Sequence, residues 1–180
     1  GLEPAFLTTG ADMLKPVARG LLAVILLAAI GWYGWQLGPW ADGAPGDRAP
    51  ADFTVLERAS TPNQYLVAPP GTTPRAEPDA ESPVFPVPPE RLRDAMLAVV
   101  EEAPRTTLLE RSPDGMRMLL VQRSALLRFP DYVDVAILPA GEGGSTVAVY
   151  SRSRFGYSDM GVNRRRVEAW LADLKRRIGA

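Results

Sequence analysis

The sequence predicts an α+β domain that is held to a membrane by one transmembrane helix. Three features lead to this prediction: an apolar stretch without charge between Arg19 and Asp42, several short runs of alternating apolar residues, and helically spaced apolar residues near the C-terminus. We expect an antiparallel sheet of about five strands with two helices packed on one face, in the order β-α-β-β-β-β-α, because such helices must bury their apolar face on a sheet.

The apolar stretch is long enough to cross a bilayer. Residues 17–37 would form roughly 31 Å of helix, the thickness of the hydrocarbon core. Lys15 and Arg19 precede it, so the positive-inside rule places residues 1–16 in the cytoplasm and the C-terminal domain across the membrane. Aromatic residues gather at its far end, as in an interfacial belt: Trp32, Tyr33, Trp35 and Trp40. A cleaved signal peptide is the alternative, although no A-x-A cleavage site follows.

These features predict a single-pass protein of a bacterial inner membrane, with residues 17–37 in the lipid bilayer and a periplasmic domain. Residues 38–83 read as a proline-rich linker, since 12 of the 18 prolines lie between residues 38 and 89. Within it, residues 52–70 contain enough apolar side chains, Phe53 and Leu56 among them, to lie against the domain. The domain is expected over residues 84–180. Its predicted elements are an edge strand at 83–88, a helix at 89–103, strands at 105–112, 116–124, 132–139 and 145–154, and a final helix after residue 163.

The segment "RSALLRF" at residues 123–129 has two interpretations. Leu126 and Leu127 could form a loop that touches a membrane, or they could continue a strand into the core. We expect the second.

Composition excludes several kinds of chemistry. The chain has no cysteine and no histidine, so nucleophilic systems that use these residues, and thiolate or imidazole metal sites, are excluded. No calcium-loop motif occurs either. We therefore expect no catalytic residue, no metal and no cofactor. The net charge of −1 does not favour nucleic acid as a partner.

The stretch "SRSRFGYSDMGVNRRRVEAW" at residues 151–170 is the candidate functional motif. Alternation along the strand places Arg152 and Arg154 on the face opposite the core. Gly156 and Gly161 supply the positive φ angles of a turn. Asn163 is the expected cap of the final helix.

Arg164 and Arg166 fall in the first turn of that helix, where positive charge opposes the helix dipole. Something anionic must therefore compensate them. An internal carboxylate is one alternative: Asp159, Glu168 or the acidic residues of the first domain helix. An external anion is the other, either an anionic lipid or a phosphate-bearing ligand. We expect an internal partner near Asp159 for Arg154, and an external anion for Arg164 and Arg166. The candidate site residues are Arg154, Ser158, Asp159, Asn163, Arg164 and Arg166, with Gly156 and Gly161 as the turn glycines.

The same stretch resembles the C-terminal signature of the domain-of-unknown-function family 1499, which has the form S-x-S-R-x-G-x-S-D-x-G-x-N-R-x-R-V-E. The match has no gap from Ser151 to Glu168, and the resemblance covers roughly residues 60–178. An upstream family element reads P-N-C; Pro62 and Asn63 match it, and Gln64 stands in place of the cysteine. The resemblance implies no particular activity.

The function expected from these features is a membrane-anchored, noncatalytic module that binds a partner or an anionic ligand. An accessory structural subunit of a membrane complex is the alternative, with the transmembrane helix docking on its partner. A carboxylate-dependent enzyme that uses Asp159 is less favoured, because Ser158 has no evident base.

Overall fold

The computed structural model describes the backbone of residues 10–37 and 49–179. The chain divides into two compact units, residues 1–41 and residues 42–180. The first part of the predicted cytoplasmic tail (1–9), the first part of the predicted linker (38–48) and Trp40 lie outside the described residues, as does the side chain of Trp35.

The first unit contains helix α1, Gly10–Leu37. Among the described residues this is the one helix that is long and apolar enough to cross a membrane, over the 19 residues Pro16–Gly34. Its length and composition are consistent with a single-pass anchor. A signal sequence near an N-terminus meets the same criteria.

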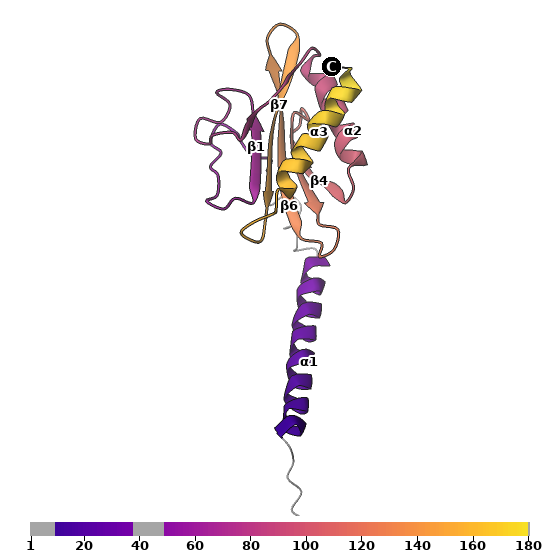
Figure 1. The fold of residues 1–180 in the computed structure, drawn as a ribbon. Coiled ribbons are helices and arrows are strands. Elements are labelled where there is room, and N and C mark those ends of the chain that lie inside the picture. Colours follow the sequence, from indigo (N-terminus) through magenta and orange to yellow (C-terminus); the bar gives the residue numbers. More distant parts are fainter. Residues whose placement is uncertain (1–9, 38–48, 180) are drawn as a thin grey trace, which may run out of the picture. The chain divides into compact units, whose positions relative to one another are not determined.

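The second unit is built on a mixed sheet, in which the structure describes seven strands (Figure 1). Six of them follow the order β2-β1-β7-β6-β5-β4, and β3 also pairs with β7. The strands are β1 (Gln64–Ala68), β2 (Ala80–Glu81), β3 (Val84–Phe85), β4 (Thr106–Arg111), β5 (Arg117–Arg123), β6 (Pro130–Ala140) and β7 (Gly144–Ser153). The helices are α2 (Pro89–Glu102) and α3 (Val162–Ile178).

The predicted α+β class is confirmed, and β3-α2-β4-β5-β6-β7-α3 reproduces the predicted order. Strands β1 and β2 were not predicted, and they pair in parallel, so the sheet is mixed rather than purely antiparallel. Both lie within residues 38–83, the segment interpreted as linker. Strand β1 escapes prediction because Pro62 and Pro69 flank it closely, although no proline interrupts it. Its other edge pairs with β7, so it is an interior strand.

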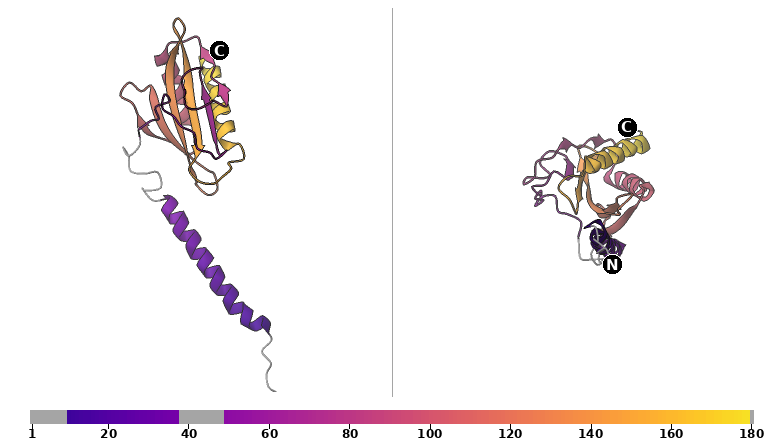
Figure 2. Two further views of the ribbon diagram at one scale, coloured as in Figure 1. Left: turned by 90° about the vertical axis from the view of Figure 1, so that its left-hand side faces the viewer. Right: turned by 60° about the horizontal axis from the view of Figure 1, so that its bottom comes forward.

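Helices α2 and α3 cover one face of the sheet and lie side by side, as the right-hand view of Figure 2 shows. Leu92 and Met96 of α2 and Trp170 and Leu174 of α3 are buried there against Val149 and its neighbours on the strands. The helical spacing of these apolar residues is the reason for this arrangement, since it places them on one stripe of each helix.

The opposite face is also covered, by residues that precede β1. Phe53 and Leu56 are buried against Ala136, Ala148 and Tyr150 in a second apolar cluster. The face on which alternation places Arg152 and Arg154 is therefore packed as well, and the core is not confined to the helix side of the sheet. On this face Arg152 forms an ion pair with the buried carboxylate of Asp134, which compensates its charge inside the domain.

Residues 124–129 form a loop, and our preference for a strand that continues into the core was wrong. Strand β5 ends at Arg123, and Ser124 closes the loop: its N–H donates to the carbonyl of Phe129, and its Oγ accepts from the N–H of Phe129, both at 2.9 Å. Leu126 is 83% exposed and Leu127 is 50% exposed.

Candidate functional site

The signature stretch forms the end of β7, a connection over residues 154–161, and the start of α3. Gly156 and Gly161 have φ angles of 85° and 77°, in the left-handed region that glycine adopts without strain. Gly161 directly precedes the first helical residue, Val162. The chain therefore turns from strand to helix at these two glycines.

The carboxylate of Asp159 caps α3. One oxygen accepts the backbone N–H of Gly161 at 3.0 Å, and the other accepts the backbone N–H of Asn163 at 2.6 Å and its side-chain amide at 2.8 Å. A negative charge here satisfies free N–H groups and complements the positive end of the helix dipole. Asn163 was predicted as the cap, and this is a correction: the helix begins earlier, and Asn163 is a fully buried residue of its first turn.

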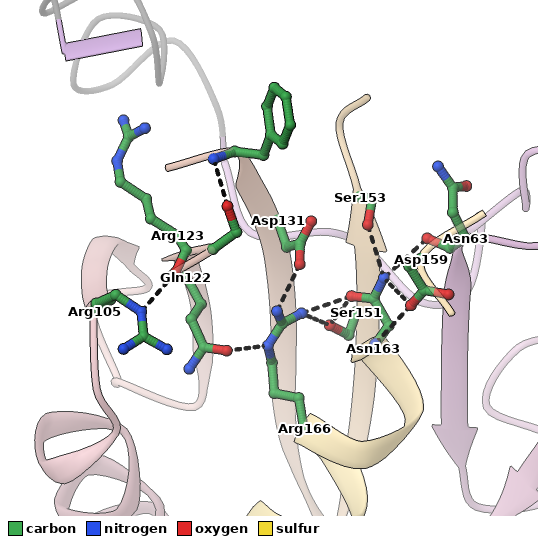
Figure 3. A network of polar contacts seen from close by, with 12 residues as sticks. Asn63, Arg105, Gln122, Arg123, Asp131, Ser151, Ser153, Asp159, Asn163 and Arg166 are labelled. Carbon is green, nitrogen blue, oxygen red and sulfur yellow. Dashed lines mark hydrogen bonds and ion pairs between the residues drawn. The ribbon is translucent and has the colours of Figure 1, made fainter. Parts of the chain in front are cut away.

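Asn163 joins three segments of the domain through its side chain (Figure 3). Its Nδ2 donates to the carbonyl of Asn63, just before β1, and to Ser153 Oγ at the end of β7, both at 3.0 Å. Its Oδ1 accepts a hydrogen bond of 2.6 Å from Ser151 Oγ. Asn63 in turn donates from Nδ2 to the carbonyl of Gly156. A buried amide with this many partners fixes the start of α3 relative to the sheet.

Arg166 lies in the same buried network and is 7% exposed. Its Nη2 pairs with Asp131 Oδ2 of β6 at 2.6 Å. Its Nη1 donates to Ser151 Oγ at 2.8 Å and to Asn163 Oδ1 at 2.6 Å, and its Nε donates to the Gln122 side chain (Figure 3). A planar guanidinium suits such a site, because its donors are held in a rigid fork.

The partner Asp131 was not anticipated, although the sequence carries a signal for it. Asp131 shares its alternation with Val133 and Val135 of β6, which face the helices in the core. A carboxylate at such a position needs a buried cation. Gln122 is the register partner of Asp131 on the neighbouring strand, so the strands present adjacent polar groups to Arg166.

Arg164 points to a different place, an open hollow of about 640 Å³ next to the start of α3. Its lining residues come from the segment around β1, from Asp79 and Ala80, from the 154–161 connection and from α3: Pro62, Gln64, Tyr65, Asp79, Ala80, Ser158, Asp159, Gly161, Arg164 and Glu168. The Nε of Arg164 pairs with Glu168 at 2.7 Å, and this hydrogen bond raises the pKa of Arg164 above its usual value. Its guanidinium lies over the ring of Tyr65, 5.9 Å from the centroid. Partial burial raises the pKa of Tyr65.

Arg154 has a third set of neighbours. It donates to the Tyr132 hydroxyl at 3.4 Å and lies over the ring of Phe155 at 5.2 Å. The contacts found for Arg154, Arg164 and Arg166 are thus all different, and they do not describe one common cationic site. Of the predicted site residues, the structure joins Asp159, Asn163 and Arg166 in the buried network, and it places Ser158, Asp159 and Arg164 on the hollow.

Comparison with protein families identifies the domain. The model of the family described as "Protein of unknown function (DUF1499)" matches residues 54–174, more than half of the chain. The chain belongs to this family. The start of the match agrees with the structure, in which the segment before β1 is part of the DUF1499 domain core.

Two solved structures are similar at low sequence identity. A crystal structure of TTHA0849 from Thermus thermophilus is 17% identical, and the alignment covers 54% of this chain and 93% of that chain with a TM-score of 0.31. A START superfamily protein from Mycobacterium smegmatis is 15% identical, with 54% and 94% covered and a TM-score of 0.33. No match was found among curated proteins.

The DUF1499 signature separates into a buried half and an open half. The buried half consists of the network around Ser151, Asn163 and Arg166; Ser153 and Asp159 are partly exposed and bond to Asn163 at its edge, and Asp159 also lines the hollow. The open half borders the hollow and includes Ser158, Arg164 and Glu168, all exposed. The residue at the position of the family cysteine, Gln64, is also structural: it accepts from the Tyr150 hydroxyl and donates to the carbonyls of Ala59 and Thr61.

The described residues include no group of three or more carboxylates that could hold a metal ion. Each carboxylate at the hollow has donors in the domain: Asp159 accepts from the start of α3, Glu168 from Arg164, and Asp79 from Arg58 and the N–H of Leu66. The arrangement offers an exposed guanidinium, an aromatic ring and a hydroxyl, groups that can bind a polar ligand.

Proposed function

We propose that this chain is a single-pass membrane protein whose DUF1499 domain is a noncatalytic binding module, and that the hollow at Arg164 receives the anionic group of a ligand or partner. The observation that carries the proposal is the split of the signature. The buried network occupies Asp159, Asn163 and Arg166, whereas Arg164 and Ser158 border an open hollow.

The anion would bind by displacing Glu168 from Arg164. This ion pair is exposed, with 65% of the Arg164 side chain and 48% of the Glu168 side chain accessible. Exposed ion pairs contribute little to stability, so opening this one is easy. The Tyr65 ring supports the guanidinium from one side and leaves its fork available for bidentate contact with a phosphate or carboxylate.

Phosphate binding to the full-length protein in detergent tests the site. The substitution Arg164→Gln should abolish a calorimetric signal with inorganic phosphate or pyrophosphate at low ionic strength, because the donor fork is lost. The matched control is Arg176→Gln. Arg176 is a similarly exposed arginine that pairs with Asp173 at the other end of the same helix, and its replacement should leave binding intact. Binding that is equal in both variants, or absent from the unsubstituted protein, contradicts the proposal.

In this proposal the domain lies on the opposite side of the membrane from the N-terminus. This orientation is supported by the apolar span Pro16–Gly34 and by Lys15 and Arg19 at the N-terminal end of that span. A periplasmic location in a bacterial cell follows from the same rule. A reporter that is active only outside the cytoplasm, fused after Ala180, should be active. Activity of a cytoplasm-specific reporter at the same position contradicts this orientation, and a mature chain without residues 13–40 contradicts the anchor.

A further inference from the structure

Two loops meet at one end of the sheet: residues 124–129 between β5 and β6, and residues 154–161 between β7 and α3. The strand register brings them together, because Arg123 pairs with Pro130 and Asp131 pairs with Ser153. The rings of Phe129 and Phe155 lie 6.2 Å apart. The two loops therefore form one surface, and we refer to them as the paired loops.

The paired loops carry four of the eight exposed large apolar side chains in the described part of the domain, and Val162 follows directly after them. Leu126 is 83% exposed, Tyr157 is 73% exposed and Met160 is 86% exposed. Leu127 and Val162 lie beside them and are also exposed. Elsewhere in the described part of the domain such side chains are separate from one another: Val55, Val84 and Leu108. Apolar side chains gathered on one surface indicate a contact with a membrane or a partner.

Each loop accepts a backbone hydrogen bond from an arginine that lies close to it in sequence. Arg123 donates from Nη1 to the carbonyl of Arg128 at 2.9 Å. Arg165 donates from Nη1 to the carbonyl of Met160 at 2.9 Å. These bonds restrain part of each loop backbone, which lowers the entropy lost when the loops bind.

The charge on the paired loops is positive. They contribute Arg128 and Arg154, and their one carboxylate, Asp159, is neutralised by the start of α3. Apolar tips, a tyrosine and arginines are the side chains that occupy the headgroup region of a bilayer. Arginine near that region is attracted to anionic lipids.

The chain also supplies the surface that these loops would meet. Residues 38–48 join α1 to the described part of the domain. Even a fully extended chain spans only about 3.5 Å per residue, so this connection reaches at most roughly 40 Å. If α1 crosses a membrane, the domain remains close to the lipid surface, and a weak contact becomes effective through its high local concentration.

We propose that the paired loops insert their apolar tips into the headgroup region of the bilayer that holds α1, and that Arg128 and Arg154 make this contact selective for anionic lipids. The inference rests on the membrane anchor of the proposed function and is independent of the hollow at Arg164. The contact would fix which side of the domain faces the membrane.

The chain contains no cysteine, so single-cysteine variants carry a fluorescent label at one position only. The full chain is placed in nanodiscs of phosphatidylcholine, with or without phosphatidylglycerol, that contain nitroxide-labelled lipid. The test labels are at Leu126→Cys and Met160→Cys. The control label is Glu142→Cys, in the β6–β7 turn at the opposite end of the same strands. A label at Ala28→Cys in α1 reports the anchor separately.

With phosphatidylglycerol, the labels at positions 126 and 160 should be quenched by the lipid nitroxides and should emit at shorter wavelength, while the label at 142 should not. Leu126→Asp should reduce the quenching of the label at position 160, because the two loops insert into the bilayer together. Val84→Asp, an exposed apolar residue at the other end of β7, should have no effect. Arg128→Gln should weaken insertion roughly fivefold in anionic nanodiscs and not in neutral ones.

The outcomes separate the two proposals. If the label at 28 is quenched and those at 126 and 160 behave like the one at 142, the anchor stands and the inference about the paired loops is overturned. Quenching at 126 and 160 that does not depend on phosphatidylglycerol overturns the selectivity for anionic lipid. If the label at 28 is not quenched, the anchor itself is wrong.

Discussion

Replacement of Arg166 by methionine should destabilise the domain strongly. The substitution removes four hydrogen bonds, to Gln122, Ser151, Asn163 and Asp131. It leaves the carboxylate of Asp131, which is 7% exposed, without its cation. Removing one partner of a buried ion pair costs about 3–5 kcal/mol, because the remaining charge stays out of water. A domain of this size has a total stability of about 5–15 kcal/mol, so the loss is a large share of it.

The measurement uses residues 42–180, which form a compact unit. Trp170 is the one tryptophan in this fragment and is buried, so its fluorescence follows unfolding in urea. For a domain of this size 1 kcal/mol corresponds to roughly 3–4 °C in melting temperature, and the loss should therefore appear as a fall of about 10–20 °C.

Two further variants test the physical reason. Arg164→Met removes an exposed arginine from the same turn of the helix and should change the melting temperature far less. The double variant Arg166→Met with Asp131→Leu removes both charges and should be more stable than Arg166→Met alone, since an apolar pair replaces an unpaired buried charge. A loss below about 1 kcal/mol in Arg166→Met, or a double variant no more stable than the single one, refutes the assignment of Arg166 to a structural ion pair.

Three other substitutions in the same fragment give further tests. Asp159→Ala should cost about 0.5–2 kcal/mol, as loss of a helix cap does, and a neutral result in urea unfolding contradicts the capping role. Trp170→Ala should cost about 3–5 kcal/mol when followed by circular dichroism; a loss below about 1 kcal/mol means that its side chain is not part of the core. Burial raises the pKa of Tyr150 above 10.0. The stability that depends on a neutral Tyr150 hydroxyl is therefore fully present below the unfolded-state pKa near 10, and it is lost as the pH rises through the folded-state pKa. Tyr150→Phe should reduce this alkaline loss in melts recorded at increasing pH, and an unchanged pH profile contradicts the assigned pKa direction.

The central part of the fold could be predicted because its signals are local. Alternation along β6 and β7 and the three- and four-residue spacing in α3 depend only on neighbours in sequence. Strand β1 could not be predicted from such signals. It is five residues long between prolines, and its place beside β7 is decided by tertiary pairing. For the second face, the expectation that Phe53 and Leu56 lie against the domain is confirmed, but which strands they cover is decided by tertiary contacts.

The site was predicted in composition but not in arrangement. The rule that arginines at a helix start need an anion is local. The expectation of an external anion was wrong for Arg166, whose charge is compensated inside the domain by Asp131, while Arg164 pairs with Glu168. Which anion serves each arginine depends on which way the side chain points. Arg166 lies one turn before Trp170 on the stripe of α3 that faces the sheet, and its partner Asp131 is 35 positions away in sequence. Alternation on β6 places that carboxylate on the helix-facing side, but only the packed structure brings the two together.

The split between buried and open residues changes what the family signature can be used to argue. Ser151, Ser153, Asp159, Asn163 and Arg166 are explained by the need to satisfy polar groups of the buried network, so their presence in a relative is evidence for the fold and not for a ligand. Arg164, Ser158 and Glu168 have no such explanation, because they are exposed and border the hollow. A functional hypothesis for this domain must therefore be tested at these three positions. The buried network matters to it indirectly, because it holds the start of α3, and with it Arg164, in a fixed place beside β1.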